Sequence, residues 1–372
     1  MLKILFVTSA THTPDYKNLN HFQRVYFLSR NAELTILAGR DADFTVSAAE
    51  GTRVIRASRA GKAGLFMHAL RSAFSGAGRK YDIVLTEPSV LAMSGYFFKL
   101  LGGCKWVVDV WDIPIRCHMG HSRAVKVRCA LQRMVLKRMF KKADLFILSI
   151  LPDFEFKRFN IPPEKVLALK NAIWPVEPKT PAAKPPQPFT ILCMRSVHTF
   201  DMGLDVLARA FALLKQRLPE AELVIVGEIP YDIRSQLGPV EGMPGVRLTG
   251  YIAYGELQRA MREAAVFVVP FKDVPDLAQT YPIKIIEYMA EGKPIVASDI
   301  EGTSRMIKHG ENGLLFRAGD HRDLAEKLLK LAGDEDLYAG LTRAGVRHNP
   351  EFDCETKNKL IMRGLQELAG RT

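Results

Sequence analysis

The 372-residue sequence contains few cysteines and no motif that is typical of a metal site. The five cysteines are scattered and form no CxxC pair, which argues against a disulfide framework or a structural zinc site and favours a reducing compartment. We expect them to be buried as small hydrophobic side chains. The histidines show no ligand spacing, and the triplet Asp41-Ala42-Asp43 indicates a loop. The sequence therefore predicts no metal and no other cofactor.

Long apolar runs are also missing. None approaches the roughly 18 residues that are needed to cross a bilayer. The most apolar stretch, residues 89–102, is too short and contains Lys99. The first residues, MLKILFVTSATHTPDYKN, have one basic residue before a short apolar run and no small-residue cleavage site, so they predict a β-strand rather than a signal peptide. We expect a cytoplasmic protein.

Acidic residues are scarce in the first half only. Residues 1–180 hold 28 Lys and Arg against 14 Asp and Glu, a net charge of +14, whereas residues 181–372 hold 24 against 26, a net charge of −2. This asymmetry predicts that the N-terminal half faces an anionic partner. No aromatic-basic RNA motif or DNA-reading element accompanies the charge, so nucleic acid is not the expected partner.

The basic excess is densest between Arg123 and Lys142, where eight cations occur, and no acidic residue is found from Ile113 to Ala143. Apolar residues interleave at helical spacing, which predicts an amphipathic basic helix that docks on an anionic membrane surface. The alternative is a helix that packs by its apolar stripe while its cations are merely solvated. The predicted membrane or acceptor face comprises Arg123, Lys126, Arg133, Lys137 and Lys141, and the interleaved apolar residues are Val127, Leu131, Met134, Val135 and Met139.

Short apolar runs alternate with helix-length segments along both halves. The runs are apolar throughout, as expected of strands that are covered on both faces, and the alternation predicts parallel, doubly wound α/β sheets. The expected strands are 3–8, 34–38, 53–56, 83–86, 106–110 and 145–149 in the first half, and 189–194, 222–226, 246–249, 266–270 and 294–298 in the second.

A proline-rich segment separates the two halves. Residues 174–189 contain six prolines and no hydrophobic periodicity, which indicates a semi-rigid linker. We place the linker at 176–186 and the second domain at 187–349. In open α/β sheets ligands bind at the carboxyl ends of the strands, so a ligand is expected in the cleft between the two halves.

The segment from Gln279 to Gly302, QTYPIKIIEYMAEGKPIVASDIEG, is the most informative stretch. Pro282 suits the first turn of a helix and Gly292 suits its end. Lys284 and Glu287 fall on one face, and Ile285, Ile286, Met289 and Ala290 form the opposite, apolar face. Phosphates could therefore bind at the helix start and a ribose one turn further on. The spacing alone also fits a surface helix with a solvated Lys/Glu face.

The sequence PIKIIEYMAEGKP, residues 282–294, resembles the donor-site motif of the family-4 (group 1) retaining glycosyltransferases of the GT-B fold, P-x-K-x-x-E-Y-M-A-x-G-K-P-V. Similarity extends over most of the second half. The resemblance implies two Rossmann-like domains that face a central cleft, with the C-terminal helix returning to the N-terminal domain. The first domain would then comprise residues 1–175 and 350–372.

The resemblance also implies roles for individual residues. Arg195 and Lys284 should contact the diphosphate of a nucleotide-sugar donor, and Glu287 should bind the ribose. Asp112, after an N-domain strand, should face the sugar and the acceptor, which gives Asp112, Arg195 and Lys284 as catalytic candidates. The remaining donor-binding candidates are Gly227, Ile252 (through its backbone, to the base), Gln279, Tyr281, Pro282, Ile283 and Ile285.

Several positions depart from the family pattern. The lysine that usually precedes the loop glycine is Met202, and the first acid of the E-x7-E pattern is Gln279. A histidine often found before the strand-end Asp is Trp111, and a Pro-Glu pair is replaced by Ser304-Arg305. The replacement of the first acid by Gln279 affects the expected recognition of the sugar in particular. Cations and helix N–H groups would stabilise the departing diphosphate and take the place of a metal.

The sequence therefore predicts a glycosyltransferase that moves a sugar to a glycan or lipid-linked acceptor, with retention, at the inner face of the membrane. A non-catalytic, membrane-associated scaffold of the same fold is a second hypothesis, because Met202 and Gln279 depart from the pattern. A sugar-nucleotide epimerase is a third. A dinucleotide-dependent oxidoreductase is disfavoured, because neither half opens with GxGxxG.

Overall fold

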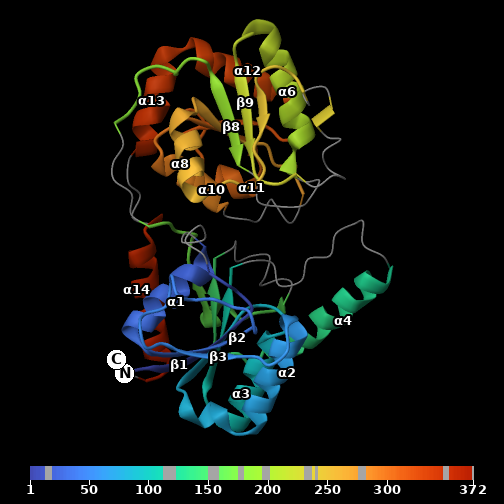
Figure 1. Ribbon diagram of the computed structural model, residues 1–372, viewed down its shortest axis with the longest axis vertical. Helices are drawn as coiled ribbons and strands as arrows, with labels where there is room; N and C mark the ends of the chain where they lie inside the picture. The colour runs from blue at the N-terminus through green and yellow to red at the C-terminus, as the bar shows by residue number, and fades with distance from the viewer. Residues whose placement is uncertain are drawn as a thin grey trace. The chain divides into compact units, whose positions relative to one another are not determined.

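The computed structural model describes residues 1–12, 19–111, 123–149, 159–174, 180–194, 202–229, 237–238, 242–274, 282–346 and 352–370. The chain forms two compact units (Figure 1). Unit 1 comprises Met1–Trp174 and Glu351–Thr372, and unit 2 comprises Pro175–Pro350. The chain thus leaves unit 1, completes unit 2 and returns to unit 1 through its last helix.

Unit 1 contains a parallel sheet in the order β3-β2-β1-β4-β5-β6-β7. The order reverses between β1 and β4, as in a doubly wound fold. The strands are β1 (Lys3–Thr8), β2 (Glu33–Ala38), β3 (Arg53–Arg56), β4 (Ile83–Thr86), β5 (Lys105–Val110), β6 (Leu145–Leu148) and β7 (Val166–Ala168).

Alternate residues of each central strand in unit 1 face opposite helix layers. In β1, Ile4 and Phe6 share a buried cluster with α1 (Asn20–Asn31) and α14 (Cys354–Leu368). Leu5 and Val7 belong to a second cluster on the other side of the sheet. The helices of that second side are α2 (Gly61–Phe74), α3 (Ala92–Gly102) and α4 (Arg123–Phe140), and the 3-10 turn η2 (Ala77–Lys80) connects the first of them to β4.

Unit 2 contains a second parallel sheet in the order β10-β9-β8-β11-β12-β13. The strands are β8 (Thr190–Met194), β9 (Glu222–Val226), β10 (Val246–Leu248), β11 (Val266–Val269), β12 (Ile295–Asp299) and β13 (Leu314–Arg317). The helices are α6 (Leu204–Arg217), α8 (Tyr254–Glu263), α10 (Ile283–Ala290), α11 (Glu301–Ser304), α12 (His321–Gly333) and α13 (Glu335–Val346).

The predicted doubly wound α/β class is confirmed, with two exceptions among the strands. The edge strands β7 and β13 were not predicted. β7 has three residues, follows two prolines and is only partly buried, so it lacks the apolar run that marks the other strands. β13 is short, and glycines lie on both sides of it.

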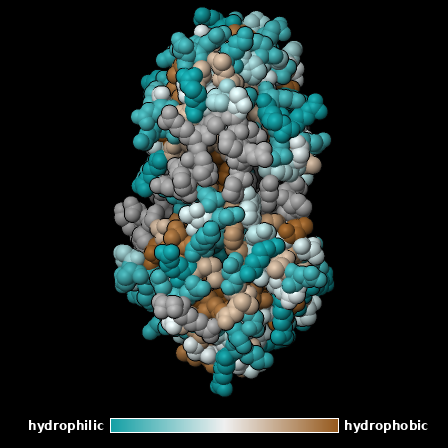
Figure 2. Space-filling view, turned by 90° about the vertical axis from the view of Figure 1, so that its left-hand side faces the viewer, coloured by the Kyte–Doolittle hydropathy of each residue, from teal (hydrophilic) through white to brown (hydrophobic). Residues whose placement is uncertain are grey.

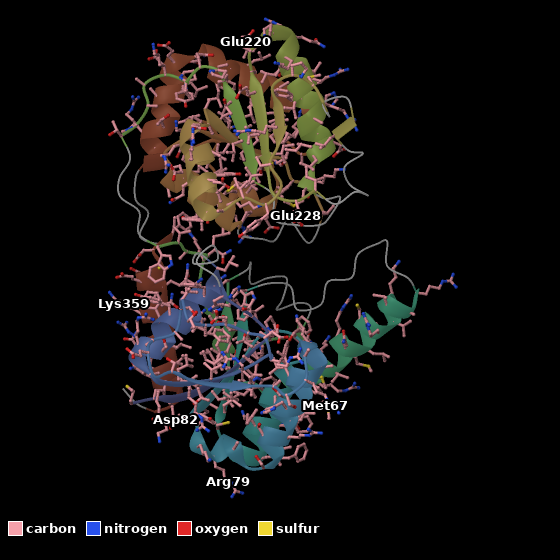
Figure 3. The ribbon with its side chains drawn as sticks, in the orientation of Figure 1. Met67, Arg79, Asp82, Glu220, Glu228 and Lys359 are labelled. Atoms are coloured by element: carbon pink, nitrogen blue, oxygen red, sulfur yellow. The ribbon has the colours of Figure 1, made fainter. Side chains whose placement is uncertain are left out.

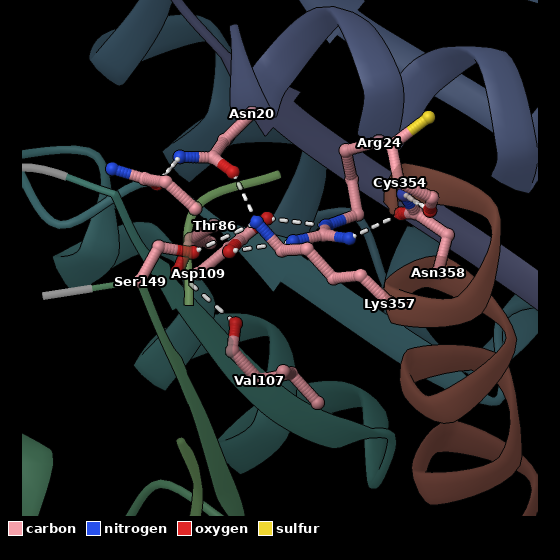
Figure 4. A network of polar contacts seen from close by, with 10 residues as sticks. Asn20, Arg24, Thr86, Val107, Asp109, Ser149, Cys354, Lys357 and Asn358 are labelled. Atoms are coloured by element: carbon pink, nitrogen blue, oxygen red, sulfur yellow. Dashed lines mark hydrogen bonds and ion pairs between the residues drawn. The ribbon is translucent and has the colours of Figure 1, made fainter. Parts of the chain in front are cut away.

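A buried polar network holds α14 against the other elements of unit 1 (Figure 4). Arg24 of α1 makes a two-point ion pair with Asp109 of β5, through distances of 2.6 and 3.1 Å. The remaining guanidinium nitrogen of Arg24, Nη1, donates a hydrogen bond to the Oδ1 of Asn358 at 2.6 Å. Lys357 donates to Asn20 and, at 3.3 Å, to Ser149. The returning helix therefore completes the hydrogen bonding of a charge pair that lies in the interior.

Within the described residues, no helix is both long enough and apolar enough to span a membrane. Figure 2 shows one side of the molecule, on which hydrophilic residues predominate and apolar residues form small separate spots. Cys104, Cys129, Cys193 and Cys354 are buried and are not joined in disulfides, in the small hydrophobic role that was expected. The fifth cysteine, Cys117, lies outside the described residues.

Candidate functional site

The carboxyl ends of β8 and β11 form the point in unit 2 at which the strand order reverses. After β8 the chain continues to β9 on one side, and after β11 it continues to β12 on the other. Ligands of doubly wound sheets bind at such a switch point. Helix α10 follows β11, and its first turn is tied to the end of β8 by the contacts described next.

Two residues of α10 hold the last residue of β8. The Nζ of Lys284 donates to the carbonyl oxygen of Met194, and the backbone N–H of Met194 donates to the Oη of Tyr288, both at 2.8 Å. Tyr288 is fully buried and stacks on Phe267 of β11, with ring centroids 4.1 Å apart. Burial raises the pKa of the Tyr288 phenol well above its ordinary value, so it stays neutral. The end of β8, which precedes Arg195 in the sequence, is thereby fixed to α10.

A glycine allows α6 to begin close to the end of β11. Gly203 caps α6 with a φ of 69°, and a Cβ at this position would lie 1.7 Å from the carbonyl oxygen of Pro270. No side chain fits there. Met202, which occupies the place of the family's lysine, is buried. Together with Lys284 it lines a small pocket whose walls also include Cys193, Met194, Leu204, Val268, Val269, Pro270 and Phe271.

The other predicted donor residues lie along the same edge of the sheet. Gly227 and Gly250, which follow β9 and β10, pair through a 2.9 Å hydrogen bond from the Gly227 N–H to the Gly250 carbonyl. Ile252 follows two residues later, just before α8. Burial, and then the charges of Glu287 and Glu291, raise the pKa of Tyr254 in the first turn of α8. The beginning of α8 is therefore close to the carboxylates of α10.

The structure brings together Gly227, Ile252, Pro282, Ile283, Lys284, Ile285 and Glu287, all on the loops and helix starts that follow β9, β10 and β11. Pro282 is the N-cap of α10, one position before the first turn in which the sequence placed it. The N–H of Ile285 donates to the Pro282 carbonyl at 3.0 Å, so this group is already engaged within the first turn. Asp112, Arg195, Gln279 and Tyr281 lie outside the described residues.

Sequence reasoning missed the structural role of Tyr288. The spacing predicted Ile285, Ile286, Met289 and Ala290 as the apolar face of α10, but the fully buried residues are Ile285, Ile286 and Tyr288. Met289 and Ala290 are only half-buried. The available signal was the position of the tyrosine, four residues after Lys284, which puts both side chains on one side of the helix.

The carboxyl edge of the unit 1 sheet carries a second polar cluster. The His12 and His21 rings stack at 4.9 Å and share a 2.9 Å hydrogen bond, and the Nδ1 of His12 lies 2.6 Å from the Oγ of Ser47. Burial, and then the charge of His21, lower the pKa of His12 to about 3. Burial lowers the pKa of His21 to about 4. Trp111, at the end of β5, lies beside His21, with ring centroids 5.9 Å apart.

The basic helix predicted around Arg123–Lys142 is α4, Arg123–Phe140. Its buried residues are Cys129, Leu136 and Phe140, whereas Val127, Leu131 and Met134 are exposed. Three of the apolar residues that interleave with the cations therefore do not attach the helix to unit 1, whereas a fourth, Met139, packs against the buried cluster. Of the predicted face, Arg123, Lys126 and Lys141 are exposed, and Arg133 and Lys137 are half-buried.

Comparisons with known proteins agree on a glycosyltransferase architecture. Residues 188–334 match the family model described as Glycosyl transferases group 1. The chain is 28% identical over 182 residues to a phosphatidyl-myo-inositol mannosyltransferase of Mycolicibacterium smegmatis, covering 49% of this chain and 46% of that protein. It is 28% identical over 217 residues to the amylovoran biosynthesis glycosyltransferase AmsK of Erwinia amylovora, covering 57% and 50%.

The same fold is found in the crystal structure of Anabaena Alr3699/HepE in complex with UDP and glucose. The TM-score is 0.71 at 17% identity, over 99% of this chain and 100% of that chain. The predicted GT-B fold is thereby confirmed. The sequence matches are shorter, since the chain spans about half the length of the curated relatives named above. The part of the chain that matches the group 1 glycosyl transferases is residues 188–334, which lie in unit 2.

Proposed function

We propose that the protein is a glycosyltransferase that transfers a sugar from a nucleotide-sugar donor to a glycan or lipid-linked acceptor. The observation that carries this proposal is the attachment of α10 to the end of β8 through Lys284 and Tyr288. It places the N-terminus of a helix, with its partial positive charge, and a lysine at the switch point of a parallel sheet. The named relatives, which are transferases, support the same activity.

The donor diphosphate is assigned to the first turn of α10. The N-terminal N–H groups of α10 and the Lys284 ammonium supply positive charge there. Arg195, the next residue in the chain after Met194, is assigned to the same phosphates. Pro282 fixes the entry into the helix, with Gln279 and Tyr281 just before it.

The nucleoside is assigned to the adjacent loops. Glu287, one turn into α10, would accept hydrogen bonds from the ribose hydroxyls, and the backbone of Ile252 would meet the base. The electrostatic influence of Glu287 on Tyr254, two residues after Ile252, supports this arrangement, because it places both groups within one small region. Gly227, with a φ of 110°, lets the chain turn away after β9 without a side chain.

For the reaction, we propose a metal-independent transfer with retention of the anomeric configuration. As the bond from the sugar to the diphosphate breaks, negative charge grows on the leaving phosphate oxygens. Lys284, Arg195 and the α10 N-terminus would stabilise this charge in the transition state more than in the ground state. Asp112 would face the sugar and the acceptor. Donor binding that survives chelation of divalent cations is the expected result.

The acceptor is assigned to unit 1, and the basic helix α4 to an anionic membrane surface at the cytoplasmic side. The cations of α4 and the absence of Asp and Glu from its sequence support this assignment. Each Lys or Arg held near an anionic surface contributes about 1 kcal/mol, so several together suffice for reversible attachment.

The donor site is tested by calorimetric titration of the native chain with UDP, GDP and ADP, in parallel with Glu287→Ala. We expect one of the three nucleotides to bind, and its affinity to fall at least about tenfold in the variant, the loss of a strong hydrogen-bonding pair. Glu326→Ala, which removes an exposed glutamate from α12 of the same unit, is the matched control and should bind as the native chain does.

Binding of none of the three nucleotides would overturn the donor site and favour the non-catalytic scaffold. A bound nucleotide-sugar that changes its sugar without releasing nucleoside diphosphate would indicate an epimerase instead. Release of nucleoside diphosphate in the presence of an acceptor is the outcome that the proposal requires.

A further inference from the structure

The helices α2, α3 and α4 form one layer on the same side of the unit 1 sheet. Their sequences contain no Asp or Glu. Six of the ten exposed large hydrophobic side chains among the described residues lie on these three helices, at 48–67% exposure. The layer also carries nine Lys and Arg: Lys62 and Arg71 on α2, Lys99 on α3, and Arg123, Lys126, Arg128, Arg133, Lys137 and Arg138 on α4.

Helix α4 has apolar residues on two opposite sides. Cys129 and Leu136 are buried against unit 1, seven residues apart. Val127 and Met134 have the same spacing but precede them by two positions, which turns them by about 200° around the helix axis. They are exposed, as is Leu131 between them. Packing within unit 1 therefore explains why Cys129 and Leu136 are apolar, but it does not explain why Val127, Leu131 and Met134 are.

The neighbouring helices of the layer also carry exposed apolar side chains. Met67 and Phe74 on α2 and Leu100 on α3 are exposed, and Phe74 lies against Phe97 with ring centroids 5.7 Å apart. Figure 3 labels Met67 on α2 and Arg79 on the following turn η2, where the Arg79 side chain extends away from unit 1. Arg79 and Lys80 on this turn are exposed and add two further cations.

Charge and apolarity together decide what kind of partner fits. The acidic side chain nearest in sequence to α4, Asp144, is only 17% exposed and pairs with Lys99 at 2.7 Å. A surface with cations, exposed apolar side chains and no carboxylate repels basic partners and a like-charged second copy of itself. It complements a surface with anionic groups above an apolar layer, which is the composition of an anionic lipid bilayer.

We propose that the outer face of the α2–α3–α4 layer, and not α4 alone, is the membrane-binding surface of this protein. Val127, Leu131 and Met134 insert below the headgroups, Phe74 and Leu100 enter from the neighbouring helices, and the cations bind the lipid phosphates. The proposal rests on the membrane contact of the proposed function and names the surface that makes it.

The test is co-sedimentation of the full chain with vesicles of phosphatidylcholine alone and of phosphatidylcholine with one-quarter phosphatidylglycerol. We expect salt-sensitive binding to the anionic vesicles only. Leu131→Gln with Met134→Gln should weaken it at least about tenfold, because two inserted apolar side chains are lost. Arg128→Gln with Arg138→Gln should weaken it roughly 25-fold, about fivefold for each cation. Phe74→Ser with Leu100→Ser should also weaken it, which separates the layer from α4 alone.

Val46→Asn with Leu360→Gln is the matched control, since both are exposed apolar residues of unit 1 outside the layer, and it should bind as the native chain does. Equal binding by native and layer variants would overturn the proposal. So would a native dimer that the Leu131 and Met134 changes disperse, or binding to duplex DNA in place of vesicles. Nucleotide titration of the same samples tests the donor site independently. Vesicle binding without nucleotide binding would contradict only the donor site, and nucleotide binding without vesicle binding would contradict only this surface.

Discussion

Lys284 donates a 2.8 Å hydrogen bond to the carbonyl oxygen of Met194, the last residue of β8. Tyr288, one turn further along α10, accepts the N–H of the same residue. Both polar backbone groups at the end of the central strand are thus satisfied by one helix. The two side chains couple the position of α10 to the end of β8, the residue that precedes Arg195 in the sequence.

Tyr288→Phe is expected to weaken donor binding as well as stability. The ring keeps its stacking on Phe267, but the buried N–H of Met194 loses its acceptor, which costs about 1–3 kcal/mol. We expect a lower free energy of unfolding by urea and a several-fold weaker nucleotide affinity by calorimetry.

Tyr338→Phe is the matched control for that experiment. Tyr338 is also buried, and its Oη donates at 2.8 Å to Ala265, which precedes β11 at the opposite edge of the sheet. Tyr338→Phe should lower the free energy of unfolding by a similar amount to Tyr288→Phe, without changing nucleotide affinity. Equal losses of affinity in both variants would mean that the effect of Tyr288 is general and not local to the site.

Gly203→Ala is expected to destabilise unit 2 strongly. A φ of 69° costs an alanine about 1–2 kcal/mol, and its Cβ would also overlap the Pro270 carbonyl, so a total of about 2–4 kcal/mol is expected. Gly255→Ala, in the first turn of α8 with no atom near its added Cβ, should be neutral or slightly stabilising. Thermal unfolding of both variants checks the pair, and similar melting temperatures would contradict the close approach of α6 to β11.

The buried Lys357 predicts stability that rises with pH. Burial, and then the charge of Arg24, lower its pKa to about 7 in the folded chain, against 10.5 when it is exposed. Between these values the unfolded chain binds the proton and the folded chain does not, so the free energy of unfolding increases with pH by about 1.4 kcal/mol per unit.

The measurement is urea unfolding of the native chain and of Lys357→Met at pH 7, 8 and 9. The free energy of unfolding of the native chain, minus that of Lys357→Met, should increase as pH rises. The contributions of the other titrating groups are the same in both chains and cancel in this difference. Lys359→Met removes an exposed lysine from the same helix and serves as the control. A constant difference between native and Lys357→Met would contradict a neutral buried amine.

Because burial lowers the pKa of both His12 and His21, we expect the free energy of unfolding to fall on mild acidification. Both pKa values are depressed in the folded chain, to about 3 and about 4, so the unfolded chain binds more protons below pH 6.5. Stability that is complete above pH 6.5 should fall by about 1.4 kcal/mol per histidine and pH unit as pH drops to 5. Native chain, His12→Asn with His21→Asn, and His68→Asn should be compared by urea unfolding. The double variant alone should show a flatter pH dependence.

The sequence predicted the central strands closely because they are apolar throughout. β1 was placed at Lys3–Thr8, the bounds it has in the structure. Helix α10 and the positions of Lys284 and Glu287 were predictable from a proline, a glycine and a motif. The edge strands were not, because a half-buried strand of three or four residues has no distinctive pattern.

Helical periodicity also left the faces of α4 undecided. Val127, Leu131 and Met134 recur at a spacing that fits a buried stripe, and the alternative of a helix attached by those residues followed from it. Cys129, Leu136 and Phe140 are attached instead, since a second apolar stripe two residues out of phase reaches the sheet. Local spacing cannot rank two stripes on one helix, because only the tertiary contacts decide which is covered.

The passage of the chain through unit 2 before α14 has a consequence for biosynthesis. During translation, Arg24 and Asp109 are synthesised long before Asn358, whose side chain hydrogen-bonds to Arg24 in the finished protein. The nascent first unit must therefore wait, with one face of its sheet only partly covered, by α1, until the whole of unit 2 has emerged. Co-translational completion proceeds from the inserted unit outward, and α14 closes the older unit last.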